Sequence, residues 1–209
     1  VGPEYHGKVT LMQVAPLSRG DVRAYGEIRR SLEQAAGRIN GRFGDADWTP
    51  IRYLNRNFDH SDLMGFLRAA QVGLVTPVRD GMNLVAKEFV AARDDNAGVL
   101  VLSSFAGASR EMQEALIVNP YDTEGLASAI DRALTMPREE QMERMKLMRA
   151  QIRENNVYRW AASILIDAAR SRKRDRLVDI AASAEASRAR KAGAGAIRLP
   201  AKRAAAAAR

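Results

Sequence analysis

The sequence predicts an α/β protein with a doubly wound parallel sheet, and three observations support this fold class. Short apolar runs alternate along the chain with segments whose apolar residues repeat about every 3.6 positions. The apolar runs are continuous rather than alternating, which suits strands buried on both faces of a parallel sheet. With 209 residues, 46% of them hydrophobic, the chain can also bury one sizeable core.

Five predicted strands follow one another, and all but the fourth have a helical segment behind them. The strands are expected at residues 9–14, 48–54, 73–76, 98–102 and 116–118. The first three are followed by helices that begin near Ser18, Ser61 and Asn83, and Gly41 is expected to end the first of these. Three further helices are expected after residues 119–122, at Pro137 and around Trp160. This alternation predicts one α/β domain.

The most informative stretch is Val72–Phe89, which combines a strand, a polar turn and the opening of a helix. Pro77 cannot extend the strand because it has no amide proton to donate. The helical spacing starts at Asn83, so residues 79–82 form the loop ahead of the helix. Unpaired N–H groups and the positive end of a helix dipole favour an anion, and open α/β sheets bind ligands at this edge. The stretch therefore predicts an anion-binding loop.

Two charged residues fit such a site. Glu88 has no basic residue three or four positions away, so a local ion pair does not explain it. Beside a bound phosphate it could accept hydrogen bonds from sugar hydroxyls, although an exposed glutamate without a role is the alternative. Arg19 precedes the first helix at the same edge of the sheet. The N-terminal end of a helix is already positive, so an arginine there is unfavourable unless it binds an anion. Arg19 therefore indicates an anion site, and the alternative is an ordinary surface arginine.

The run Thr76–Glu88, which contains Arg-Asp-Gly-Met-Asn-Leu, resembles the donor-site signature of the trehalose-6-phosphate synthases. These are glycosyltransferases with the two-domain GT-B fold. The resemblance covers about residues 3–169 and concerns only the second half of a synthase, the Rossmann-like domain. It implies that the first, central strand of the sheet is missing between residues 9–14 and 73–76. We therefore expect the isolated chain to be unstable, or these two strands to pair directly.

The same resemblance implies an activity: transfer of glucose from UDP-glucose to glucose 6-phosphate with retention, giving trehalose 6-phosphate and UDP. No cofactor and no metal are implied. Arg19 would contact the acceptor phosphate, Phe58 the uracil, and Asp80 the transferred glucose as the catalytic residue. Phe58 could also be an ordinary loop aromatic. The implied donor-binding residues are Phe58, Asp80, Gly81, Met82, Asn83, Leu84 and Glu88. Without the acceptor-binding N-terminal domain, the fragment alone is expected to be inactive.

The composition limits the other possibilities. Cysteine is absent, which excludes disulfides and cysteine zinc sites, and no apolar run is long enough to span a bilayer. We therefore expect a cytoplasmic protein that is not bound to a membrane. The net charge of +8 resides in residues 171–209, which have eleven Lys or Arg and three Asp or Glu. The predicted domains are accordingly residues 1–170 and a disordered basic extension, 171–209, capable of weak nonspecific polyanion binding.

Several alternatives remain open from the sequence. The chain could belong to another GT-B glycosyltransferase with a different nucleotide sugar or acceptor, because the glutamate and the helix amides suit many donors. It could instead be a noncatalytic module that binds a nucleotide or a polyanion. The small residues of Ser103–Gly107 let that loop approach either a ligand or neighbouring backbone, and close packing is the simpler explanation. A homo-oligomer is also possible.

Overall fold

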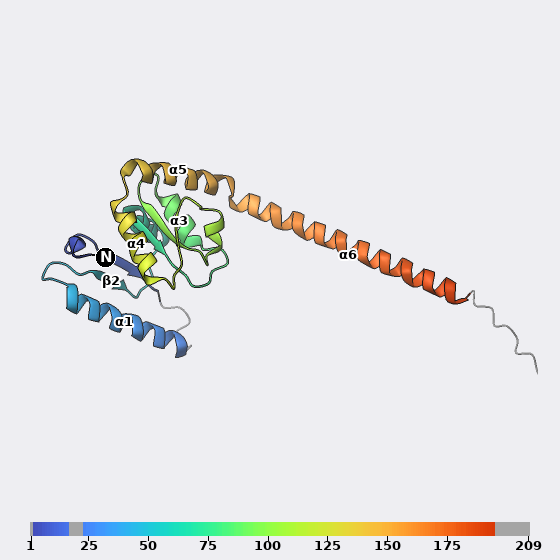
Figure 1. The fold of residues 1–209 in the computed structure, drawn as a ribbon, viewed down its shortest axis with the longest axis horizontal. Coiled ribbons are helices and arrows are strands. Elements are labelled where there is room, and N and C mark those ends of the chain that lie inside the picture. The colour runs from blue at the N-terminus through green and yellow to red at the C-terminus, as the bar shows by residue number, and fades with distance from the viewer. Residues whose placement is uncertain (1, 17–22, 195–209) are drawn as a thin grey trace, which may run out of the picture. The chain divides into compact units, whose positions relative to one another are not determined.

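The computed structural model describes residues 2–16 and 23–194 of the chain, shown in Figure 1. The chain forms two compact units, Val1–Glu154 and Asn155–Arg209, and each is described by itself. The first unit contains every strand and five of the α-helices in the described ranges, and the second contains one long helix.

The helices and strands follow the predicted alternation (Figure 1). In chain order they are η1 (Pro3–Tyr5), β1 (Leu11–Val14), α1 (Arg23–Phe43), β2 (Ile51–Leu54), α2 (His60–Ala69), β3 (Val72–Val75), α3 (Leu84–Ala92), β4 (Val99–Ser103), η2 (Gly107–Arg110), β5 (Leu116–Val118), α4 (Thr123–Thr135), α5 (Arg138–Glu154) and α6 (Val157–Ala194).

All strand pairs are parallel, as the sequence predicts. β1 pairs with β2, with Leu11 opposite Ile51. β4 pairs with β3 on one side and with β5 on the other. Parallel strands that are neighbours in sequence need a crossover, and the helices provide it. The carboxyl ends of β3, β4 and β5 therefore meet at one edge of their sheet.

The two faces of β4 show that the sheet is doubly wound. Leu100 and Leu102 are fully buried and belong to a core cluster that includes Phe89 of α3 and Met145 of α5. Val99 and Val101 point to the opposite face, where their cluster includes residues of α4, among them Ala133, Leu126 and Ala129. Helices therefore cover both faces of this sheet, which explains why all five residues of β4 are buried. The predicted fold class is confirmed.

The strands form two separate sheets, of two and three strands. β1 and β3, between which the sequence predicts a missing central strand, thus belong to different sheets. The direct pairing of these two strands that we considered does not occur. Within the described residues, β1 pairs only with β2 and β3 only with β4, so each has one edge without a strand partner.

The first helix ends two residues later than predicted. Gly41 lies inside α1, which continues to Phe43. The N–H of Gly44 donates to the carbonyl oxygen of Asn40 at 2.8 Å, and a Cβ at Gly44 would lie 2.5 Å from that oxygen. Gly44, and not Gly41, is therefore the residue that the helix end requires.

The second unit differs from the expected extension. α6 runs through the predicted boundary at residue 170 to Ala194, so residues 171–194 are helical where the composition predicts disorder. The reason is local, because Ala, Arg, Lys and Leu are strong helix formers, and the first glycine of this region is Gly193. The division at residue 170 stays a prediction. None of the described helices is long and apolar enough to cross a membrane.

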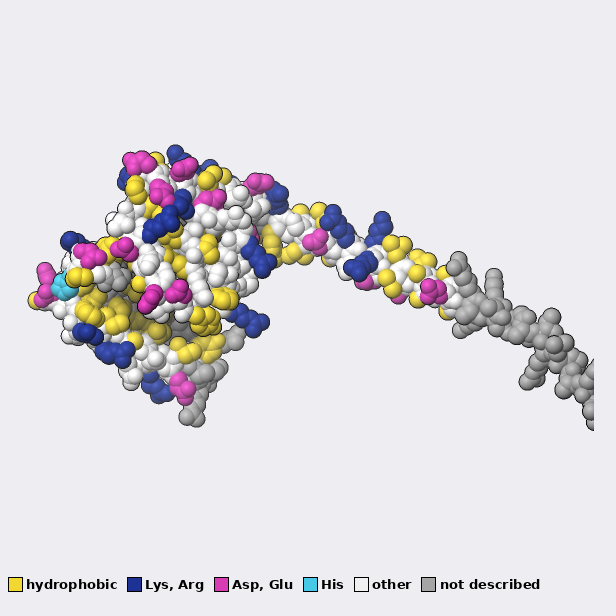
Figure 2. All heavy atoms as spheres, viewed as in Figure 1, with side chains coloured by type: hydrophobic (Ala, Val, Ile, Leu, Met, Phe, Trp, Pro, Cys, Tyr) yellow, Lys and Arg dark blue, Asp and Glu magenta, His cyan; other side chains and the backbone are white. Residues whose placement is uncertain are grey.

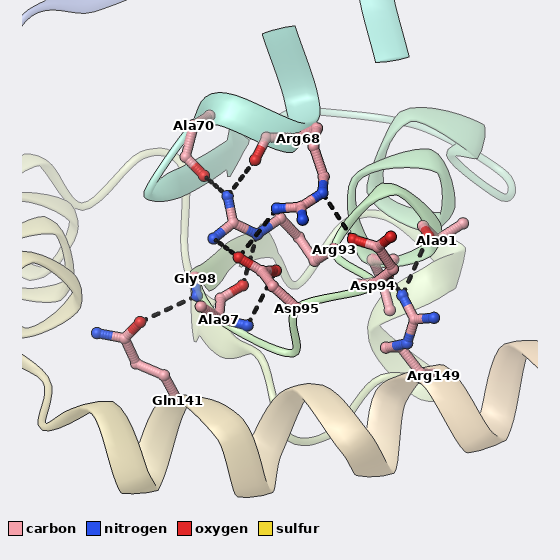
Figure 3. Close-up of polar contacts among 11 residues, drawn as sticks. Arg68, Ala70, Ala91, Arg93, Asp94, Asp95, Ala97, Gly98, Gln141 and Arg149 are labelled. Atoms are coloured by element: carbon pink, nitrogen blue, oxygen red, sulfur yellow. Dashed lines mark hydrogen bonds and ion pairs between the residues drawn. The ribbon is translucent and has the colours of Figure 1, made fainter. Parts of the chain in front are cut away.

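A buried arginine joins the end of α2 to the loop between α3 and β4 (Figure 3). Arg93, only 6% exposed, follows the last residue of α3. Its guanidinium donates to the carbonyl oxygens of Ala97 at 2.6 Å, Arg68 at 2.5 Å and Ala70 at 2.7 Å, and to the carboxylate of Asp95 at 3.0 Å. Arg93 therefore satisfies the carbonyls that the end of α2 leaves unpaired.

A cavity of about 230 Å³ adjoins this arginine. It is lined by Arg93, Asp95, Gln71 and Gly98, and the last two precede β3 and β4. The side-chain oxygen of Gln141 accepts a hydrogen bond from the Gly98 N–H at 2.9 Å. The cavity therefore lies at the amino-terminal edge of the sheet, opposite the edge at which the sequence predicts ligand binding.

Candidate functional site

The site predicted from the sequence centres on the loop between β3 and α3, residues 76–83. α3 begins at Leu84, and Asn83 is its N-cap. The side-chain oxygen of Asn83 accepts a hydrogen bond from the Ala86 N–H at 2.8 Å, and its backbone has a positive φ of 74°. Asparagine tolerates this conformation better than most residues and is a favoured cap. The predicted opening of a helix after a polar loop is therefore confirmed.

Asp80 shapes this loop through both of its carboxylate oxygens. Oδ1 accepts a hydrogen bond from the Met82 N–H at 3.1 Å, and Oδ2 accepts one from Nδ2 of Asn83 at 2.9 Å. A carboxylate offers about four acceptor positions, so Asp80 keeps capacity for a ligand hydroxyl. The amide of Met82, one of the implied donor-binding residues, is therefore already engaged by Asp80.

Three other amides of the loop remain open. The N–H groups of Gly81, Asn83 and Leu84 have no hydrogen-bond acceptor among the described residues. The Leu84 side chain is 60% exposed, so the helix start faces solvent. Unpaired amides combined with the positive end of a helix dipole make this point suitable for a phosphate or another anion.

Glu88 lies one turn further along α3. Its side chain is partly buried, and it has no hydrogen-bond or ion-pair partner among the residues that the structure describes. Its neighbour Lys87 is paired instead with Glu111 at 2.8 Å. A partly buried carboxylate without a partner is unusual, because burial removes water from the charge. Glu88 is thus available to accept hydrogen bonds from a ligand.

The two remaining predicted residues are less informative. Phe58 lies in the loop between β2 and α2, where its ring contacts Phe66 edge to face with centroids 5.1 Å apart. The guanidinium of Arg56 lies 4.6 Å from the Phe58 ring centre. These contacts fit an ordinary loop aromatic, and the predicted base contact stays a prediction. Arg19 lies outside the described residues.

A second segment packs against the β3–α3 loop. It comprises residues 103–108, at the end of β4 and the start of η2, and we call it the bracing segment. A Cβ placed on Gly107 would lie 2.0 Å from the carbonyl oxygen of Gly81. Of the two possibilities that the small residues left open, the structure therefore shows close approach to neighbouring backbone. The run of small residues was the available signal, but it did not indicate which backbone is approached.

No cluster of three or more His, Cys, Asp or Glu residues suited to a metal ion occurs in the described part of the chain. The chemistry of the loop is that of hydrogen-bond donors for an anion, with acceptors on Asp80 and Glu88 for hydroxyl groups. That combination suits a phosphorylated sugar or a nucleotide.

Comparison with known proteins agrees with this chemistry. The model of glycosyltransferase family 20 matches residues 1–170. The chain belongs to glycosyltransferase family 20. The trehalose-6-phosphate synthase of Klebsiella pneumoniae is 58% identical to this family 20 chain over 166 residues, which are 79% of this chain and 35% of that enzyme.

Solved structures give the same result. The Escherichia coli protein bound with UDP-2-fluoro glucose is 55% identical, with a TM-score of 0.77, over 79% of this chain and 37% of its own. The trehalose-phosphate synthase of Burkholderia xenovorans in complex with glucose-6-phosphate is 51% identical, with a TM-score of 0.77, again over 79% and 37%. The family 20 chain thus spans about a third of the length of its curated relatives.

Proposed function

We propose that this chain is the donor-binding part of a trehalose-6-phosphate synthase. In the complete enzyme, glucose would pass from UDP-glucose to glucose 6-phosphate, giving trehalose 6-phosphate and UDP. The observation that carries this proposal is the start of α3, where three amides are open and the unpaired Glu88 lies one turn behind them. The relatives described as bound with a UDP-sugar analogue and with glucose-6-phosphate support the same substrates.

Each predicted residue has a role in this proposal. The amides of Gly81, Asn83 and Leu84 hold the diphosphate, and Glu88 accepts hydrogen bonds from the ribose hydroxyls. Asp80, already fixed by Met82 and Asn83, holds the hydroxyls of the transferred glucose. Phe58 contacts the uracil, and Arg19 binds the phosphate of the acceptor.

The reaction would rely on positioning and charge. As the bond from C1 of glucose to the diphosphate breaks, negative charge grows on the leaving oxygen, and fixed N–H groups stabilise it without having to reorient. The acceptor hydroxyl forms the new bond to C1 and passes its proton to the leaving diphosphate oxygen, and UDP departs. Retaining glycosidases use two carboxylates for this chemistry, whereas in this proposal Asp80 and Glu88 bind the glucose and the ribose. Holding both substrates in contact would supply much of the rate enhancement.

Titration calorimetry of this chain with UDP tests the proposal, with Glu88→Gln as the variant. A hydrogen bond to a charged group contributes about 1.5–3 kcal/mol. Because each 1.4 kcal/mol is about tenfold in affinity, the variant is expected to bind UDP about 10- to 100-fold more weakly. Glu139→Gln, at an exposed position of α5, is the matched control and should leave affinity unchanged. Absence of UDP binding, or equal binding by the Glu88→Gln variant, would refute the proposal.

Another GT-B glycosyltransferase remains the alternative within the same class. The discriminating residue is Arg19, because only a phosphorylated acceptor needs it. In a complete enzyme, Arg19→Ala should raise the KM for glucose 6-phosphate while leaving the donor KM nearly unchanged. An unchanged acceptor KM would favour a different acceptor. The cytoplasmic location and a homo-oligomer stay predictions.

A second function is suggested by the charge on α6. Five of the seven residues from Arg170 to Arg176 are Lys or Arg, all exposed, and Asp175 is the acidic one. Figure 2 shows basic side chains gathered on this helix. We propose weak, nonspecific polyanion binding here. Binding of a short RNA should fall steeply as salt rises, and replacing Arg172, Lys173 and Arg174 by Gln should flatten that dependence. Equal salt dependence in the variant would contradict the proposal.

A further inference from the structure

The bracing segment holds the β3–α3 loop through three backbone hydrogen bonds. The Asp80 N–H donates to the carbonyl of Phe105 at 3.3 Å. In return, the Gly107 N–H donates to the carbonyl of Asp80 at 3.0 Å, and the Ala108 N–H donates to the carbonyl of Met82 at 2.8 Å. Asp80 and Ala106 also form an isolated parallel bridge. The loop is thereby tied to the end of β4 as a short extension of the sheet.

These contacts determine which backbone groups of the loop are left for a ligand. The carbonyl oxygens of Asp80 and Met82 accept bonds from the bracing segment, and the carbonyl oxygen of Gly81 lies against Gly107. Three successive carbonyls are therefore turned toward the segment. An anion is repelled by carbonyl oxygens and attracted by N–H groups. In a trans peptide the N–H points away from the carbonyl oxygen, so turning these carbonyls to one side leaves the open amides of Gly81 and Asn83 on the other.

Gly107 is the tightest point of this contact. Its hypothetical Cβ would lie 2.0 Å from the Gly81 oxygen and 2.8 Å from the Gly81 carbonyl carbon, distances that backbone atoms cannot tolerate. Its φ lies outside the left-handed region, so the need for glycine here comes from the contact and not from backbone conformation. Any side chain at residue 107 must push the β3–α3 loop away.

The bracing segment itself is firmly held. Ala106 is 2% exposed, and Ala108 is fully buried in the core cluster behind α3. Ser103 is also fully buried, and its hydroxyl oxygen accepts a hydrogen bond from the Phe105 N–H at 3.1 Å. The segment can therefore act as a rigid support, because moving it would disturb close-packed atoms.

From these contacts we infer that Gly107 is a positioning residue of the donor site, acting through the backbone of residues 80–82. It touches no substrate; it sets the orientation of the amides that bind the diphosphate. The inference rests on the proposed donor-binding function.

The test uses Gly107→Ala in this chain, with Gly65→Ala of α2 as the matched control. A Cβ at Gly65 meets no atom within 4 Å, so this control adds the same methyl group without a clash. The first measurement is amide hydrogen exchange without nucleotide, at the Met82 N–H bonded to Asp80 and the Ala86 N–H bonded to Asn83. Gly107→Ala should accelerate exchange at both amides at least tenfold, and Gly65→Ala should not.

The second measurement is UDP affinity by calorimetry. Gly107→Ala should weaken UDP binding at least tenfold, and Gly65→Ala should bind like the unmodified chain. Ser103→Ala is a milder second variant, for use if Gly107→Ala does not fold. It removes only the support for Phe105, and it should weaken UDP binding severalfold.

The outcomes separate the two proposals. If the unmodified chain binds no UDP, the donor-binding function fails, and the positioning role fails with it. If the unmodified chain binds UDP but a folded Gly107→Ala chain binds it equally well or shows unchanged exchange, only the positioning role is overturned. If the Gly107→Ala chain does not fold, the Ser103→Ala variant decides. UDP binding by Ser103→Ala as tight as by the unmodified chain would then overturn the positioning role of Gly107.

Discussion

Replacing Arg93 by methionine should destabilise the first unit by about 3 kcal/mol, because this buried guanidinium satisfies four acceptors at once. Three of them are the carbonyl oxygens of Arg68, Ala70 and Ala97, and the fourth is the carboxylate of Asp95. Methionine has a similar length but donates no hydrogen bond, so all four acceptors lose their partner.

The magnitude follows from the surroundings. Removing one partner of a buried ion pair costs about 3–5 kcal/mol. The lower end applies here, because the Asp95 side chain is 27% exposed and the adjoining cavity of about 230 Å³ can admit water to the orphaned oxygens. Given a urea m-value of about 1–3 kcal/mol/M, the unfolding midpoint should fall by about 1–3 M.

The assay is urea unfolding followed by circular dichroism, with Arg68→Met as the control. The Arg68 side chain is 45% exposed and forms ion pairs with Asp94 at 2.6 Å and Asp95 at 3.0 Å. Exposed ion pairs contribute about 0–1 kcal/mol, so this control should shift the midpoint much less. Equal midpoints for the two variants would show that burial of Arg93 is not what makes it important.

Three further predictions concern the first unit. Burial alone would raise the pKa of Asp95, but the Ala97 N–H and the nearby guanidinium groups outweigh it and hold that pKa below its usual range. The difference in unfolding free energy between the unmodified chain and Asp95→Asn should therefore be constant above about pH 4, the ordinary pKa of an aspartate. It should disappear as the pH falls through the lowered pKa of Asp95 in the folded chain. A difference that is unchanged down to about pH 2 would contradict this prediction. The Tyr5 hydroxyl donates a hydrogen bond of 2.6 Å to the Asp131 carboxylate, and this bond raises the pKa of Tyr5 to about 12. The stability that the bond contributes is therefore fully present below the ordinary tyrosine pKa and is lost as the pH rises through the raised pKa of Tyr5. In an ultraviolet titration Asp131→Asn should return that pKa to about 10, and no change would exclude the bond. Gly73→Ala would place a Cβ 2.7 Å from the Phe89 ring and should cost about 1–3 kcal/mol in urea unfolding, whereas an unchanged midpoint would show that the ring can move aside.

Much of the fold could be predicted from the sequence because the buried strands have a strong local signal. β5 was predicted with its observed bounds, and β3 and β4 within one residue at each end. Continuous apolar runs such as Val99–Leu102 have few alternatives, since a polar residue there would be buried without a partner. The loop before α3 was equally clear, because Pro77 and Gly81 interrupt both periodic patterns.

Other features depend on contacts that sequence periodicity does not contain. Nothing around Arg93 in the sequence distinguishes it from a surface arginine, because its partners include residues 23 and 25 positions earlier. The contact between Gly107 and Gly81 could likewise not be predicted, because it depends on how the two loops lie against each other in the folded chain. The burial of α3 also varies along one side of the helix, because Val85 is 49% exposed whereas Phe89, one turn later, is fully buried.

The division of the strands into two sheets affects how a nucleotide could be held. The predicted uracil contact, Phe58, follows β2, whereas Asp80 and Glu88 follow β3 on the other sheet. A continuous sheet would fix the distance between the groups that bind the base and those that bind the diphosphate. A two-stranded sheet is only marginally stable by itself, so the β1–β2 sheet alone holds Phe58 less firmly. A strand hydrogen-bonded to the free edges of both β1 and β3 would fix Phe58 relative to Asp80 and Glu88, and nucleotide affinity would then depend on whether that strand is present.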